Sequence, residues 1–278
     1  MIISELLARS GLPPLEARML AARVLEKNGT WLIAHADEPV SAGTEKAFSA
    51  LAERRGQGEP MAYILREREF YGLDFAVSPA VLIPRPETEL LVELALARIP
   101  ANAEALALDL GTGSGAIAIA LAKARPQARL TALDIDYAAL GIARENARRH
   151  RVRVRFFCGD WFGALPGEIF DLIVSNPPYV AGGDPHLAMG DVRFEPQRAL
   201  LGGADGLDCI RAIVANAAAH LRPGGWLLLE HGYNQAEACR ALLQAHAYSQ
   251  VQSWPDLAGI SRVSGGISAP NDGGNALK

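Results

Sequence analysis

Residues 106–124, LALDLGTGSGAIAIALAKA, hold the feature that most limits how this chain can fold. An apolar run of strand length leads into a glycine-rich loop, and an alanine-rich run of helical length follows it. Gly111, Gly113 and Gly115 allow the backbone to turn sharply and to approach a ligand closely. A strand, a glycine loop and a helix in this order predict one unit of a mostly parallel sheet covered by helices.

The same alternation of strands and helices continues downstream. We expect strands at residues 106–110, 130–134, 152–157, 170–175 and 226–230. A helix should begin near Pro86, because proline suits a first helical turn and Glu87 suits the helix dipole. Another should begin near Asn234, where Glu237 follows three residues on in a variant of the capping box. The pattern predicts an α/β fold with a Rossmann-like sheet.

The residues before this sheet carry a different pattern. Leu15 and Met19 begin an apolar series at helical spacing within residues 1–59, with Thr30 and Ser41 as N-caps of later helices. The pattern then changes to period two around the Gly72 turn, which predicts a β-hairpin. We therefore expect four parts along the chain: a small all-α domain at 1–59, a β-hairpin linker at 60–83, a catalytic domain at 84–267 and a disordered tail at 268–278.

Composition excludes several classes of protein. Apolar residues make up 50% and charged residues 21% of the 278 residues, as in soluble globular proteins. The net charge of −4 gives no global attraction to nucleic acid, so such a partner would need a local basic face. The three cysteines are scattered, which fits neither a disulfide framework nor a zinc site. No apolar run near the amino terminus is long enough to cross a membrane, so we expect a cytoplasmic protein. We also expect that it has no metal site and that it acts as a monomer.

Two groups of charged or titratable residues are expected to be structural. Six arginines between Arg144 and Arg155 lie across a helix end and the next strand, and we interpret them as a solvated face, because cations suit a helix C-terminus. His231 follows Glu230 at a strand end without a nucleophile at readable spacing. We interpret it as a structural histidine.

The glycine loop predicts an adenosine-containing ligand. With Ala116 the loop fits GxGxxA, and Asp134 lies about twenty residues on, where it would hold a ribose hydroxyl. Asp109 would repel a pyrophosphate but attract an ammonium group, which favours S-adenosylmethionine. The carboxylate of S-adenosylmethionine would bind the free N–H groups at the helix start. Trp161 could cover the adenine while Asp160 accepts a hydrogen bond from its amino group; an ordinary half-buried tryptophan is the alternative.

The turn Asn176-Pro177-Pro178-Tyr179 follows the expected strand at 170–175. Proline has no backbone N–H, so this turn presents acceptors with few competing donors. The Asn176 side-chain oxygen and the Pro177 carbonyl could each accept one hydrogen of a planar NH2 group, and Tyr179 could pack against that group. A carboxamide and the exocyclic amine of a base both fit. The turn would act by aligning this weakly nucleophilic nitrogen with an activated methyl group, and the sequence demands neither a metal nor a general base.

These segments resemble the bacterial peptide chain release factor glutamine N5-methyltransferases over about residues 54–263. Two segments resemble the family's linker and domain entry: RRGQGEPMAYILREREFYGLDFAV and VLIPRPETELLVE. Five segments resemble its catalytic domain: DLGTGSGAIAIALA, GDWFGAL, SNPPYV, DPHLAMGDVRFEP and LLLEHG. Glycine loops and NPPY occur in many methyltransferases, whereas residues 84–89 and 184–196 are more specific. Arg66 departs from the family pattern, because members usually have glycine there.

The resemblance implies a class I methyltransferase domain of about seven strands that methylates the glutamine of the Gly-Gly-Gln motif in class I release factors, producing S-adenosyl-L-homocysteine. The implied cofactor contacts are Gly111, Thr112, Gly113, Ser114, Gly115, Asp134, Trp161 and Asn176, and the implied glutamine contacts are Asn176, Pro177, Pro178 and Tyr179. Three alternatives remain open: a ribosomal-protein glutamine methyltransferase, an adenine N6-methyltransferase, and a non-catalytic module that binds S-adenosylmethionine. Nucleic acid and membranes are not expected partners.

Overall fold

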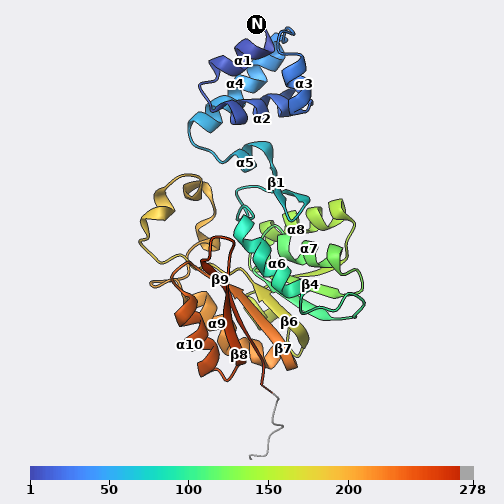
Figure 1. Ribbon diagram of the computed structural model, residues 1–278, viewed down its shortest axis with the longest axis vertical. Helices are drawn as coiled ribbons and strands as arrows, with labels where there is room; N and C mark the ends of the chain where they lie inside the picture. The colour runs from blue at the N-terminus through green and yellow to red at the C-terminus, as the bar shows by residue number, and fades with distance from the viewer. Residues whose placement is uncertain (270–278) are drawn as a thin grey trace, which may run out of the picture. The chain divides into compact units, whose positions relative to one another are not determined.

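The computed structural model describes residues 1–269, which form two compact units (Figure 1). The helical unit comprises residues 1–67 together with 188–194. The sheet unit comprises residues 68–187 and the described residues from 195 onward.

Five helices build the helical unit: α1 (Ile3–Arg9), α2 (Pro14–Leu25), α3 (Gly29–Ala34), α4 (Ala42–Gly56) and α5 (Met61–Leu65). The prediction that Leu15 and Met19 begin the apolar face of α2 is wrong, because their side chains are 65% and 40% exposed. The buried face carries Leu20 with two alanines, and small alanine side chains let helices approach closely. Ser41 caps α4 as expected. The cap of α3 is Asn28, whose side chain accepts from the Trp31 N–H at 2.8 Å, rather than Thr30.

The segment 188–194 packs with these helices through charged side chains. Arg55 donates to both Glu16 oxygens at 2.8 Å and to Asp191 at 3.1 Å. Arg193 donates to the Gln57 carbonyl at 3.0 Å. These bonds join residues up to 136 positions apart, so no local pattern could have assigned this segment to the helical unit.

The boundary between the units lies between Glu67 and Arg68, beyond the expected end of the helical domain at residue 59. Ile64 of α5 is buried in the core of the helical unit, so α5 belongs to that unit and the boundary follows it. Arg66 ends α5 with φ of +60°, a left-handed conformation that glycine adopts more easily. The hairpin of β1 (Glu67–Phe70) and β2 (Leu73–Ala76) is present as expected, and its phenylalanines belong to the core of the sheet unit.

The sheet unit alternates strands and helices as the sequence predicts. Its elements are η1 (Pro86–Thr88), α6 (Glu89–Leu96), β3 (Leu106–Leu110), α7 (Ala116–Ala124), β4 (Arg129–Asp134), α8 (Tyr137–His150), β5 (Val154–Cys158), η2 (Trp161–Ala164), β6 (Phe170–Ser175), η5 (Gln197–Ala199), α9 (Asp208–Ala217), β7 (Leu221–Glu230), α10 (Ala236–Ala245), β8 (Ser249–Pro255) and β9 (Ser261–Ile267). All five expected strands are present. The expected cap of α10 is wrong by one residue, because Gln235 rather than Asn234 precedes it.

Seven strands form one sheet in the order β5-β4-β3-β6-β7-β9-β8. The first five strands of this order are parallel, and β9 pairs antiparallel with both β7 and β8. The chain starts at β3 and winds outward in both directions, so the topological switch point lies between β3 and β6. Ligands of such open sheets bind at the carboxyl ends of the strands beside this point.

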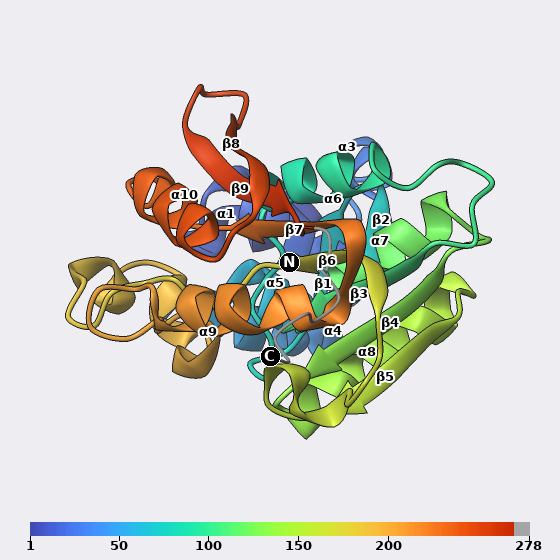
Figure 2. The ribbon, with the colours of Figure 1, turned by 90° about the horizontal axis from the view of Figure 1, so that it is seen from below.

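Helices cover both faces of the sheet (Figure 2), and an apolar layer lies beneath them on each face. Leu91 of α6 and Ile119 of α7 belong to one buried cluster, which includes Ala107 of β3 and Leu130 of β4. Ile213 of α9 and Leu243 of α10 belong to the other cluster, with the residues of β3 that point the opposite way. Both faces of β3 are therefore buried, which places its end deep in the unit.

The arginines between 144 and 155 lie near the amino ends of β4 and β5, away from the switch point. Five of the six, all except Arg149, line an open groove together with Lys123 and Arg129. Arg148, Arg151 and Arg153 are exposed, so the expectation of a solvated face is confirmed for them.

Beyond β9, the described part of the chain continues to residue 269. The Ser268 N–H donates to the Gly225 carbonyl at 2.8 Å, so the expected tail does not begin at residue 268. The rest of that tail, residues 270–278, lies outside the described residues. Within residues 1–269, we find no helix with the length and apolar character to span a membrane.

Candidate functional site

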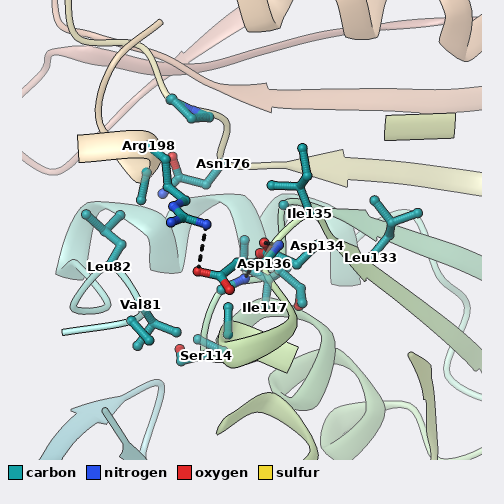
Figure 3. Close-up of a pocket in the computed structure, with 18 of the residues that line it drawn as sticks. Val81, Leu82, Ser114, Ile117, Leu133, Asp134, Ile135, Asp136, Asn176 and Arg198 are labelled. Carbon is teal, nitrogen blue, oxygen red and sulfur yellow. Dashed lines mark hydrogen bonds and ion pairs between the residues drawn. The ribbon is translucent and has the colours of Figure 1, made fainter. Parts of the chain in front are cut away.

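A cavity of about 340 Å³ lies at the carboxyl ends of β3, β4 and β6 (Figure 3). Its volume is in the range of small-molecule sites. Most of the residues expected to bind a cofactor line it: Gly111, Thr112, Gly113, Ser114, Asp134, Trp161 and Asn176. Asp160 lines it too. Sequence reasoning thus located the cavity, although which of these residues contact a ligand stays a prediction.

The glycine loop leaves only a few backbone N–H groups free. Gly111 and Thr112 both donate to the Leu133 carbonyl, at 2.8 and 2.9 Å, and Gly113 donates to Asp134 Oδ2 at 2.8 Å. The N–H groups of Ser114 and of Ala116 and Ile117, the first residues of α7, have no acceptor among the described residues, and all three residues line the cavity. Orphan N–H groups at a helix start favour an anionic group.

Gly115 has a different role from its neighbours in the loop. It does not line the cavity, and it precedes α7 with φ of +82°. A Cβ atom at this position would lie 2.9 Å from Ile119 Cδ1 and 3.1 Å from Ala143 Cβ. The third glycine is therefore required for packing of the loop against α7 and α8.

Asp134 binds the loop as well as facing the cavity. Besides accepting from Gly113, it accepts from the Asp136 N–H through Oδ1 at 2.9 Å. Burial raises the pKa of this carboxyl, while these two bonds lower it. The side chain is thus fixed in direction before any ligand binds.

The expected role of Asp109 is not supported by its position. Its side chain is fully buried beneath the loop and does not line the cavity. Oδ2 accepts from the Thr112 hydroxyl at 2.6 Å and from the Ala118 N–H at 3.2 Å. Burial raises the pKa of Asp109 to about 7. Asp109 holds the loop against α7, and in this structure it does not face the space where an ammonium group would lie.

The Asn-Pro-Pro-Tyr turn presents two unpaired acceptors at the cavity or next to it. Asn176 and Pro178 line the cavity, whereas Pro177 is buried and Tyr179 lies outside the lining. Asn176 Nδ2 donates to Thr88 Oγ1 at 3.1 Å. Among residues 1–269, no donor bonds Asn176 Oδ1 or the Pro177 carbonyl. The turn therefore keeps the acceptors that the sequence predicted.

Tyr179 is held by residues far away in the sequence. Its hydroxyl donates to Glu230 Oε1 at 3.3 Å, and its carbonyl accepts from Gln235 Nε2 at 3.0 Å. Its ring packs on the cluster beneath α9 and α10. The expectation that this ring covers a substrate group stays a prediction.

Sequence reasoning missed several residues that shape the site. Arg198 of η5 reaches Asp136 at 3.1 Å beside Asn176, as Figure 3 shows. Asn146 of α8, which is fully buried, donates to the carbonyls of Ala76 and Ser114. The roles of Arg198 and Asn146 can be recognised only from their neighbours in the structure. For Arg198 the sequence offered one signal, its position just after the family-specific segment 184–196. His231 is buried and bonds Ser264 at 2.8 Å, the structural role expected of it.

A sheet of this order, with a glycine loop after its first strand and an Asn-Pro-Pro-Tyr turn across the switch point, defines a class I methyltransferase that uses S-adenosylmethionine. Two family models match the chain: methyltransferase small domain over residues 87–203, and PrmC N-terminal domain over residues 2–65.

Comparison with known proteins narrows this class. A Bordetella pertussis protein named release factor glutamine methyltransferase is 53% identical over 266 residues, 95% of this chain and 98% of that protein. A Burkholderia pseudomallei protein of the same name is 53% identical over 270 residues, 95% of each chain. The crystal structure of a methyltransferase from Pyrococcus furiosus shares the fold, with a TM-score of 0.56 and 22% identity over 80% of this chain and 99% of that one. The chain belongs to the release factor glutamine methyltransferase family.

Proposed function

We propose that this enzyme transfers a methyl group from S-adenosylmethionine to the side-chain nitrogen of the glutamine in the Gly-Gly-Gln motif of class I release factors, and thereby tunes translation termination. The observation that carries the proposal is the pair of unpaired acceptors, Asn176 Oδ1 and the Pro177 carbonyl, beside a cofactor-sized cavity. Family relatives named for this activity cover nearly the whole chain.

The residues around the cavity fit the cofactor. The free N–H groups of Ser114, Ala116 and Ile117 suit its carboxylate, because they are unpaired and lie at the start of α7. Asp134 has an oriented carboxylate for the ribose hydroxyls, and Trp161 has an indole for the adenine. When bound, the cofactor supplies a methyl group on a positively charged sulfur.

The turn acts on the substrate by orientation. Asn176 Oδ1 and the Pro177 carbonyl each accept one hydrogen of the glutamine NH2 group, and Pro178 lines the same cavity. Tyr179, which lies outside the lining, is expected to pack against the glutamine side chain when the substrate is bound. Two neutral hydrogen bonds give only about 1 kcal/mol each in net binding. Alignment of bound reactants can supply up to ~7–11 kcal/mol of a barrier, so Asn176, Pro177 and Tyr179 act mainly by fixing the direction of the nitrogen.

The release factor is the proposed protein partner, with the helical unit as its docking domain. The PrmC N-terminal domain model matches this unit over residues 2–65. We also propose that the enzyme acts in the cytoplasm, as a monomer, alongside the release factor that it would methylate.

The decisive experiment is incubation with labelled S-adenosylmethionine and a purified class I release factor, followed by peptide mass mapping. We expect one methyl group, on the glutamine of the Gly-Gly-Gln motif. Adenine-containing oligonucleotides and a large-subunit ribosomal protein serve as competing acceptors. Preferred labelling of either competitor would replace this proposal by the corresponding alternative, and absence of any turnover would favour a binding module.

A further inference from the structure

The open groove beside α8, β4 and β5 concentrates positive charge that the proposed reaction leaves without a role. These three elements lie together at the edge of the sheet that ends with β5 (Figure 2). The groove has a volume of about 1140 Å³. Its lining contains Lys123, Arg129 and the five arginines between Arg144 and Arg155 other than Arg149, and no aspartate or glutamate of the described chain. We call this surface the basic groove.

The arginines reach the basic groove through two periodicities. Arg144, Arg148 and Arg151 follow one another at steps of four and three residues, which places them on one face of α8 and its C-terminal cap. Arg153 and Arg155 are two residues apart at the entrance to β5, which places them on one face of that strand. From the first to the last of the α8 arginines, the positive charge extends about 10 Å along the helix axis. This is a surface for an extended anion rather than for a single small ion.

Most of these cations have no acidic partner. Two of them, Arg129 and Arg155, bond glutamates that lie outside the lining. Arg148, Arg151 and Arg153 form no ion pair within residues 1–269, and all three are exposed. The negative end of the α8 dipole stabilises cations in its last turn, but this effect does not extend to the residues of the strands. An anionic partner would relieve the repulsion that remains.

The hydrogen-bonding groups of the lining fit a phosphate backbone better than an acidic protein segment. Lysine and arginine side chains donate hydrogen bonds and accept none, and a guanidinium group matches a phosphate with two parallel bonds. Among the described residues, Gln127 is the only lining side chain with an acceptor oxygen. A protein segment would bring backbone N–H donors that need acceptors, whereas a nucleic acid backbone presents phosphate oxygens along its whole length.

We infer that the basic groove binds the phosphate backbone of single-stranded RNA, independently of base sequence. With a net charge of −4, this chain attracts nucleic acid only where a local basic face exists, and the groove supplies that face. The choice of RNA over DNA rests on the proposed function, because the proposed substrate acts in translation. The binding of phosphate itself does not rest on it.

The position of the basic groove makes RNA a partner and not a methyl acceptor. The groove includes Arg129 at the amino end of β4, whereas the cavity includes Asp134 at the carboxyl end of the same strand. The six residues of β4 span about 20 Å. RNA bound in the groove therefore leaves the cavity free for the cofactor and for the glutamine.

The test titrates the full enzyme into a fluorescent oligouridylate of about 20 nucleotides and measures anisotropy at several salt concentrations. Uracil has no exocyclic amine, so this probe cannot serve as a methyl acceptor. For single strands, the logarithm of the binding constant falls with that of the salt concentration by about 0.7 per phosphate neutralised. We expect a slope steeper than about −2, from the three arginines without ion pairs. Oligothymidylate of equal length is the DNA arm.

A double substitution isolates the groove. Arg148→Gln with Arg153→Gln removes two exposed charges without breaking an ion pair among the described residues. The magnitude of the slope should fall by about 1.4, and affinity at low salt by at least about tenfold. Arg9→Gln with Arg23→Gln is the matched control, because it removes the same charge from exposed positions of α1 and α2. It should leave RNA affinity within about twofold of wild type. Thermal unfolding of both double variants verifies that they fold.

Four results would overturn the inference. Wild-type enzyme could show no salt-dependent binding, or the groove variant could lose no more affinity than the control. Tighter binding of oligothymidylate would assign the groove to DNA. A raised KM for release factor in the groove variant, measured without RNA, would assign the groove to an acidic surface of that protein.

Two further measurements check the position of the site and its independence from the reaction. Saturating oligouridylate should leave the affinity for S-adenosylmethionine unchanged, because the groove and the cavity lie at opposite ends of β4. Competition between the two would place the RNA in the cavity and overturn the inference. A wild-type enzyme that leaves release factor unmethylated would refute the proposed function, while the RNA titrations would still decide whether the groove binds phosphate.

Discussion

The two sides of the cavity are held in place by contacts of different range. The bonds that hold the glycine loop are of shorter range: Thr112 bonds Asp109 three residues away, and Gly113 bonds Asp134 twenty-one residues away on the next strand. The Asn-Pro-Pro-Tyr turn is held by Thr88, which is 88 residues from Asn176, and by Glu230, which is 51 residues from Tyr179. A local site keeps its geometry through its own sequence, whereas the turn depends on elements that the fold brings to it.

This difference separates the two proposed tasks. The loop side would bind the cofactor with the N–H groups at the start of α7, with Asp134 at the end of β4 and with Trp161 of η2. The turn aligns a weak nucleophile, a task sensitive to displacements of about 1 Å. We therefore expect changes in the loop to appear in cofactor affinity or stability, and changes in the turn to appear in the rate.

The strongest test of this division is Asn176→Ala. Methyl transfer should fall at least about 10³-fold, because orientation can supply up to ~7–11 kcal/mol of a barrier. Cofactor affinity should remain close to that of wild type, because the free N–H groups and Asp134 lie on the loop side. Single-turnover rates and calorimetric titration with S-adenosylmethionine measure the two effects separately. A matching loss in both would mean that the turn and the loop form one site.

On the loop side, the largest effect expected is on stability, at Asp109. Folding raises its pKa from 3.8 to about 7, so the folded state keeps a proton that the unfolded state releases. The stability it contributes is therefore complete below about pH 3.8 and is lost as the pH rises through 7, by up to about 4 kcal/mol. Asp109→Asn should flatten this part of the decline in the free energy of unfolding between pH 4 and 7. Denaturant titrations across that range check it, and an unchanged slope would contradict it.

The range of the contacts also explains which features of the fold and the site could be predicted from the sequence alone. All five expected strands, the hairpin and most of the cavity lining follow from local patterns, as do the unpaired acceptors of the turn. Asp109 was misassigned because its position beside the glycines does not reveal that it points under the loop into the core. Thr88, Asn146 and Glu230 could not be assigned, since their partners lie 32 to 88 residues away. The antiparallel pairing of β9 with β7 and β8 was likewise beyond local reading.

Asp134→Ala sharpens the comparison from the loop side. The change removes the carboxylate proposed to accept from the ribose hydroxyls, and hydrogen bonds to a charged group contribute about 1.5–3 kcal/mol. We expect this loss in cofactor affinity, with the rate at saturating cofactor much less affected than in Asn176→Ala. Calorimetry and kcat measurements on the two variants form the matched pair. Equal losses of cofactor affinity in both would break the proposed division.

Gly115→Ala tests whether the third glycine serves packing rather than binding. Its Cβ would meet Ile119 and Ala143, whereas Gly167, with φ of +72°, has nothing within 4 Å of the same atom. Left-handed strain of about 1–2 kcal/mol is common to Gly115→Ala and the control Gly167→Ala. Gly115→Ala should cost at least about 1 kcal/mol more in thermal stability, from overpacking. Equal losses would show that α7 and α8 adjust freely around the loop.

Arg198→Gln should give the smallest effect, because it removes an ion pair near the solvent. The Arg198 side chain is 65% exposed and bonds Asp136 at 3.1 Å, next to the turn after β4. Exposed pairs contribute about 0.2–1 kcal/mol, so cofactor affinity should fall by less than about tenfold. The difference from wild type should shrink further at high salt, because screening weakens the pair in the wild type. Titrations at low and high ionic strength measure this. A large, salt-independent loss of turnover would instead group Arg198 with the Asn-Pro-Pro-Tyr turn, as a residue that contacts the substrate.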